Sequence, residues 1–62
     1  MKLKLRAKRV EKDFTQEELA KALGVSVSTY SRYELGKTEM LESTINKLLE
    51  ILECKYEDIF LN

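Results

Sequence analysis

One short stretch of the chain combines an apolar side chain, two hydroxyls and a guanidinium: Val27, Ser28, Ser31 and Arg32. On a helix, the spacing i, i+1, i+4 and i+5 places these four groups on one stripe. The Arg32 guanidinium can donate two parallel hydrogen bonds, which match O6 and N7 of guanine. The Ser28 hydroxyl can bond either kind of base edge, and the Val27 methyl groups suit the thymine methyl. The stripe therefore predicts contacts to base edges in the major groove of double-stranded DNA.

This prediction requires the neighbouring aromatic residues, Tyr30 and Tyr33, to face the interior. Aromatic side chains can instead stack on bases, as in proteins that bind single strands. The spacing of the two tyrosines favours a place in the core, with the hydroxyls reaching the rim. From there Tyr33 can also contact a phosphate of the DNA backbone.

The elements that must position the stripe have clear start and stop signals. Thr15 and Glu18 have the spacing of a capping box, which predicts the start of a helix at Thr15. Gly24 has the backbone freedom needed for a sharp turn at the end of that helix. Ser26 is a suitable N-cap for the next helix, and Gly36 a suitable terminator. The sequence thus predicts two helices joined by a tight turn.

Three further helices complete the predicted fold. Residues 3–12 form the first, with Leu3, Ala7 and Val10 on its inner side. The fourth begins at Ser43 or Thr44, and a last helical turn covers residues 56–61. The helix-turn-helix motif occupies residues 16–35 of a single domain, residues 1–62. The fold class is all-α, with five short helices.

Charge is divided unevenly along a chain whose formal net charge is zero. Residues 1–37 contain nine Lys or Arg and five Asp or Glu, a net charge of +4. Residues 38–62 contain two and six, a net charge of −4. A basic end can meet phosphate, although a solvated surface explains the same division equally well. Charge alone therefore does not decide between these interpretations.

Several classes of protein are disfavoured by composition. Cys54 is the only cysteine, so no disulfide can form within the chain, and we expect a small buried hydrophobic residue there. The chain has no histidine, no phosphate-binding glycine loop and no nucleophile beside an evident base. We therefore expect no enzymatic activity, no metal, no cofactor and no small-molecule ligand. The charged N-terminus and the absence of long apolar runs predict a cytoplasmic protein without membrane association.

The central stretch, QEELAKALGVSVSTYSRYEL, resembles the helix-turn-helix of phage repressor and Cro proteins, also known as the xenobiotic-response-element family of regulators. The similar features are Thr15-Gln16, Leu-Ala at 19–20, Leu-Gly-Val at 23–25, Arg32 with Glu34, and Gly36-Lys37. The resemblance covers nearly the whole chain. It implies a lambda-repressor-like DNA-binding domain.

The resemblance also assigns roles to single residues. It implies that Gln16 and Lys37 contact the DNA backbone. It places the side chains of Val27, Ser28 and Arg32 toward the bases, in agreement with their spacing. It further implies that Arg9 and Glu34 form a structural ion pair between the first and third helices.

The chain departs from the family pattern after the third helix. Leu35 stands where a polar residue usually precedes the glycine, and Glu39 and Glu42 would repel phosphate. We therefore expect modest, salt-sensitive affinity for DNA, which favours binding by a homodimer. In this family, the loop before the fourth helix and the start of the last helix often form the dimer contact. The apolar residues there are Met40, Leu41, Tyr56 and Leu61.

Together these features predict a sequence-specific regulator of transcription that acts as a dimeric repressor on an inverted-repeat operator. Its chain would come from a bacterium or a phage. The alternative is an antitoxin or anti-repressor, a protein-interaction module in which the acidic C-terminal half binds another protein. Substitution of Arg32 or Ser28 separates the two interpretations, because only the first requires these side chains for binding.

Overall fold

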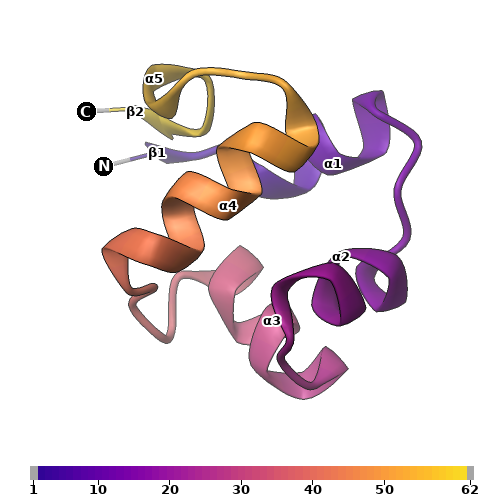
Figure 1. Ribbon diagram of the computed structural model, residues 1–62. Coiled ribbons are helices and arrows are strands. Elements are labelled where there is room, and N and C mark those ends of the chain that lie inside the picture. The colour runs from indigo at the N-terminus through magenta and orange to yellow at the C-terminus, as the bar shows by residue number, and fades with distance from the viewer. Residues whose placement is uncertain (1, 62) are drawn as a thin grey trace.

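The computed structural model describes residues 2–61, and the side chains of residues 3–60. No helix within these residues is long and apolar enough to cross a membrane. Figure 1 shows α1, α5 and a pair of short strands at the top of the view, α2 and α3 at the bottom, and α4 between them. The elements in chain order are β1 (Lys2–Leu3), α1 (Leu5–Glu11), α2 (Gln16–Leu23), α3 (Val27–Leu35), α4 (Glu42–Leu52), α5 (Tyr56–Ile59) and β2 (Phe60–Leu61). The predicted all-α fold with five helices is confirmed, and the strand pair is an addition to it.

Helix α1 buries a different face from the one that the sequence predicted. Leu5 is fully buried, whereas Val10 is 60% exposed and Ala7 is also exposed. The inner side of the helix is instead formed by Leu5 and Arg9, which lie one turn apart. The predicted stripe is therefore wrong for Ala7 and Val10, whereas Leu3 packs against the core from β1, outside the helix. The physical reason is that the Arg9 guanidinium has a partner in the interior, which apolar periodicity does not reveal.

Helix α2 begins and ends as the sequence predicted. The Thr15 hydroxyl accepts a hydrogen bond from the Glu18 amide (3.1 Å), and the Glu18 carboxylate accepts one from the Thr15 amide (2.8 Å). Gly24 ends the helix in the left-handed conformation at φ +73°. A Cβ atom at this glycine would meet nothing within 4 Å. Glycine is therefore required because another residue would be strained at this positive φ, and not because its side chain would clash with a neighbour.

Helix α3 also has the predicted ends. The Ser26 hydroxyl accepts a hydrogen bond from the Thr29 amide at 3.1 Å, which satisfies one free donor of the first turn. Gly36 ends the helix at φ +71°. The amide of Lys37 then donates to the carbonyl of Arg32 at 3.0 Å. These caps fix both ends of the helix that carries the predicted recognition stripe.

Helix α4 begins earlier than predicted, at Glu42 and not at Ser43 or Thr44. Its N-cap is Leu41, which has extended backbone angles and cannot accept a hydrogen bond with its side chain. Because leucine is among the poorest N-cap residues, the sequence placed the start at the next hydroxyl. Leu41 is 75% exposed, so burial of its side chain within the chain does not explain its presence.

The last helix is shorter than the predicted turn over residues 56–61. It ends at Ile59, and the backbone of Phe60 is extended. Strand β2 pairs with β1 in antiparallel register, with Leu3 opposite Phe60. The amide of Lys4 donates to the carbonyl of Ile59 at 2.7 Å and continues this pairing. The two ends of the described chain are therefore joined to each other.

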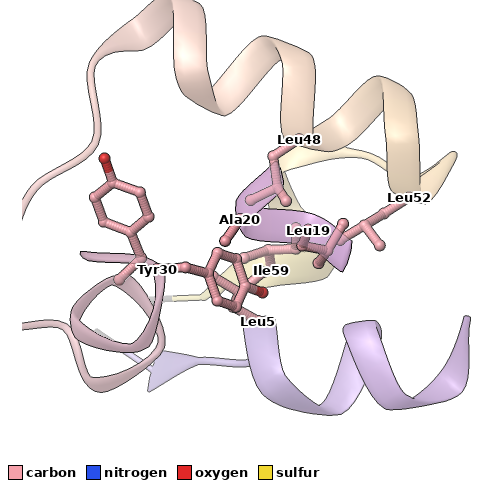
Figure 2. Close-up of a cluster of buried hydrophobic side chains, with 8 residues drawn as sticks. Leu5, Leu19, Ala20, Tyr30, Leu48, Leu52 and Ile59 are labelled. Atoms are coloured by element: carbon pink, nitrogen blue, oxygen red, sulfur yellow. The ribbon is translucent and has the colours of Figure 1, made fainter. Parts of the chain in front are cut away.

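The core lies where α1, α2, α4 and α5 meet the tyrosine face of α3. Figure 2 shows Leu48 and Leu52 of α4 pointing toward Leu19 of α2, with Ile59 of α5 and Leu5 of α1 nearby. Cys54 is half-buried against this cluster, as expected of a small hydrophobic residue. The buried residues are Leu5, Leu19, Ala20, Tyr30, Tyr33, Leu48, Leu52 and Ile59.

The capping box gives a first prediction. Replacement Thr15→Ala removes the hydroxyl that accepts from Glu18, and we expect the free energy of unfolding to fall by about 1 kcal/mol. Urea denaturation followed by helical circular dichroism measures this change. The control is Ser43→Ala, which removes an exposed hydroxyl of α4 and should change stability by less than about 0.5 kcal/mol. Equal losses in the two variants would contradict a specific role for the capping box.

Candidate nucleic-acid interface

Helix α3 has one buried and one exposed side. Tyr30 is fully buried and Tyr33 is 8% exposed, which confirms that both face the interior. Their rings meet edge to face, with centroids 6.4 Å apart and an angle of 81° between the planes. Two bulky aromatic residues packed in this way allow α3 little freedom to rotate about its axis. The opposite side of the helix is therefore held toward solvent.

The predicted recognition stripe lies on this solvent side. Val27 is 42% exposed, and Ser28 and Arg32 are also exposed. Ser31 is half-buried, so it lies at the edge of the stripe. The structure thus brings these four side chains together on one face, which begins at the first residue of the helix. Their contact with DNA remains a prediction.

The ion pair implied between Arg9 and Glu34 is present, and it is largely shielded from solvent. The Arg9 Nε donates to the Glu34 carboxylate at 2.6 Å, and the two side chains are only 12% and 5% exposed. The Arg9 Nη1 also donates to the carbonyl of Phe14 at 2.8 Å. One guanidinium therefore holds α1, the loop after it and α3 in a single arrangement.

Gln16 joins the same network, a contact that the sequence analysis did not predict. Its Nε2 donates to the second carboxylate oxygen of Glu34 at 2.9 Å. Because the amide nitrogen carries two hydrogens, one remains for another acceptor. The Gln16 side chain is half-buried and fixed in direction at the start of α2. The signal for this contact was indirect, since the Arg9–Glu34 pair already brings Glu34 toward the loop that precedes Gln16.

The network changes the protonation behaviour of its members. Burial alone would raise the pKa of Glu34, but the hydrogen bonds from Arg9 and Gln16 outweigh it, so the pKa is lowered. The hydrogen bond to Glu34 raises the pKa of the Arg9 guanidinium. Both groups are therefore charged at neutral pH.

The Tyr30 hydroxyl lies beside this ion pair. Burial raises the pKa of Tyr30 far above its ordinary value, and the Glu34 carboxylate adds to the shift. The hydroxyl is buried and has no partner of good hydrogen-bond geometry among the described residues. The prediction that this hydroxyl reaches the rim is therefore wrong, because the hydroxyl is buried beside the Arg9–Glu34 pair.

The residues expected to contact the DNA backbone differ in accessibility. Lys37 is exposed directly after Gly36. Tyr33, by contrast, has most of its surface in the core. Lys37 is thus accessible to a phosphate, whereas little of the Tyr33 side chain can be reached from solvent. Both contacts stay predictions.

The residues expected at a dimer contact lie near α4 and α5. Met40 is half-buried and Tyr56 is 49% exposed, and both line a groove of about 430 Å³. The Tyr56 ring stacks on Phe60, with centroids 4.6 Å apart. Leu41 is exposed but does not line this groove. The side chain of Leu61 lies outside the described residues.

Groups of three or more His, Cys, Asp or Glu side chains that could hold a metal ion do not occur in the part of the chain that the structure describes.

Comparisons with known proteins bear on the whole arrangement. A model of the helix-turn-helix family matches residues 5–59. The transcriptional repressor RstR of the cryptic phage CTXphi from Vibrio cholerae is 44% identical over 45 residues, which are 73% of this chain and 40% of the repressor. An uncharacterized HTH-type transcriptional regulator from Methanocaldococcus jannaschii is 41% identical over 61 residues, which are 98% of this chain and 92% of the relative. The chain thus spans less than half of the phage protein and nearly all of the archaeal one.

The buried ion pair gives a second prediction, on pH dependence. Because the folded-state pKa of Glu34 is below its ordinary value of 4.5, the pair stabilises the protein above that pH and loses its effect as pH falls through the lowered pKa. Replacement Glu34→Gln leaves the Arg9 charge buried without a counter-charge. We expect it to lower the free energy of unfolding at pH 7 by about 2–3 kcal/mol.

Urea denaturation at a series of pH values measures this effect. The difference between Glu34→Gln and the unmodified protein should shrink as the solution becomes acidic, because protonation removes the same charge. The control Glu39→Gln changes an exposed carboxylate of the loop and should leave the curve unchanged. A stability of Glu34→Gln equal to that of the unmodified protein at pH 7 would refute the structural role of the pair.

Proposed function

The chain belongs to the helix-turn-helix family of phage-repressor-type transcriptional regulators, and from this premise we propose that it binds specific double-stranded DNA through α3 and represses transcription. One observation carries the proposal. Tyr30 and Tyr33 are in the core, so the exposed side of α3 presents a single coherent set of base-reading groups. A DNA-bound regulator of this kind acts in the cytoplasm.

The order of side chains along α3 suits entry of its N-terminal end into the major groove. Val27 and Ser28 occupy the first turn, where a recognition helix comes closest to the bases. Arg32 follows one turn after Ser28, and its length allows it to reach guanine from there. Gln16 and Lys37 support the proposal from the two ends of the motif, where they can fix the position of α3 on the phosphates.

Two copies are proposed to bind together. A single domain with a few phosphate contacts binds weakly, and affinity falls steeply with salt. A two-fold dimer places two α3 helices in successive major grooves, which requires an inverted repeat with half-site centres about 34 Å apart. We place the dimer contact at Leu41 and Tyr56, both exposed, and at the half-buried Met40. Leu61 was also expected at this contact, but its side chain lies outside the described residues. Occupation of a promoter by such a dimer blocks polymerase, which is the basis for proposing repression.

A third prediction tests DNA recognition. The operator is first obtained by selection from random duplexes, and binding is then measured for Arg32→Ala and Ser28→Ala. Loss of a bidentate contact should weaken specific binding by about 1–3 kcal/mol for Arg32→Ala, and by less for Ser28→Ala. Both variants should unfold like the unmodified protein, because both side chains are exposed.

The control for charge is Lys47→Ala, which removes a positive charge from the exposed surface of α4 and should affect binding little. If all three variants bind every duplex as the unmodified protein does, and a protein partner is captured instead, the antitoxin or anti-repressor interpretation is correct.

A fourth prediction tests the dimer at Leu41. Replacement of this residue by aspartate should stabilise the monomer but weaken dimerisation. Aspartate is a good N-cap, so Leu41→Asp should stabilise the monomer by about 1 kcal/mol. The same change removes an exposed apolar side chain from the proposed contact, which should weaken dimerisation by about 1.5–3 kcal/mol for each copy. Denaturation at low protein concentration measures the first effect, and sedimentation with and without operator DNA measures the second.

The control Asn46→Asp adds the same negative charge five residues further along the chain, at an exposed position of α4. It should leave the oligomeric state unchanged. Unmodified protein that stays monomeric at micromolar concentration, both free and on DNA, would exclude the proposed dimer.

A further inference from the structure

Two exposed apolar side chains lie on the DNA-facing side of the molecule without an internal packing role. Val10 of α1 is 60% exposed and Leu35 of α3 is 65% exposed. They are distant in sequence, yet both line one groove of about 670 Å³ between the end of α1, the start of α2 and α3. Exposed apolar side chains that lie together often mark a surface that a binding partner covers.

The groove divides the exposed side of α3 into two rows. Val27, Ser31 and Leu35, spaced four residues apart, line the groove. Ser28 and Arg32 form the second row and do not line it. The row beside the groove is therefore apolar or small, whereas the second row carries the guanidinium.

We infer that this groove seats the sugar edge of one DNA strand, with Val10 and Leu35 in contact with deoxyribose. The inference rests on the proposed function. A strand whose phosphate meets Gln16 and whose bases meet Val27 and Ser31 must pass over the groove, because all three residues line it. Between phosphate and base, the surface that a strand offers is the deoxyribose ring, which is largely apolar.

The charges around the groove favour sugar over phosphate at this rim. Arg9 and Glu34 neutralise each other in the floor of the groove. Asp13 and Glu17 are exposed at its edge and repel phosphate, and they are opposed there by Arg6. The contact at Val10 and Leu35 is therefore non-ionic, and it adds affinity that does not depend on salt.

The test measures operator affinity at several salt concentrations for Leu35→Ala and Val10→Ala. Each change removes part of an apolar contact, and we expect affinity to fall about fivefold for each copy bound, hence about 25-fold for a dimer. The slope of log affinity against log salt should stay the same. Lys37→Ala serves as the contrast, because loss of one phosphate contact should lower that slope by about 0.9 for each copy.

Leu35→Met is the matched control, since it keeps an apolar side chain of similar volume and should bind nearly as well as the unmodified protein. The thermal unfolding midpoint of each variant verifies that the exposed position does not affect folding. Specific binding by the unmodified protein together with unchanged affinity in both alanine variants would overturn this inference and leave the proposed function intact. If Arg32→Ala also leaves binding to every duplex unchanged, the proposed function fails as well.

Discussion

The ion pair between Arg9 and Glu34 is the constraint on which the rest of the structure depends. A charged group in so enclosed a place is tolerated only with its partner, so the two side chains must meet whenever the chain is folded. Their meeting fixes the rotation of α1, because Arg9 can turn inward only if Val10 turns outward. It also orients Gln16 at the start of α2. The two helices that flank α3 on the groove side are thus placed by one polar contact.

The parts of the fold that sequence could predict are those governed by nearby residues. The caps at Thr15 and Ser26, and the terminating glycine at Gly24, depend on side chains within a few positions and were read correctly. The buried face of α1 differs from the prediction, because apolar periodicity takes no account of an inward-facing charged residue such as Arg9, whose partner Glu34 only the family resemblance indicated. The strand pair could not be predicted, because Leu3 meets Phe60 across almost the whole chain and each strand is only two residues long. The exposed stripe on α3 could be predicted because two inward tyrosines determine it.

The uneven distribution of charge along the sequence does not divide the fold into a basic and an acidic half. The basic excess lies in residues 2–12, which contain six Lys or Arg and one Glu, whereas α2 contains one Lys and two Glu, and α3 one Arg and one Glu. Helix α1 packs beside the acidic α5, and Lys4 and Lys8 line the same pocket as Glu57 and Asp58 (Figure 1). The positive charge of the N-terminal segment is therefore partly balanced by nearby carboxylates. A DNA-binding face on α3 would depend on single side chains such as Arg32 and Lys37, and not on a strongly basic surface.

The pairing of β1 with β2 has a consequence for how the molecule opens. Only two residues from each end form the pair, yet the contact closes a loop that contains every helix. Closing so long a loop costs conformational entropy, and only a few hydrogen bonds at the strand pair offset that cost. We therefore expect this pair to open more readily than the rest of the fold. Release of the pair would also free the Lys4–Ile59 hydrogen bond and uncover Leu5, at the point where α1 meets α5. In a hydrogen-exchange experiment, the backbone amides of β1 and β2 would then exchange quickly, and those of α2 and α4 slowly.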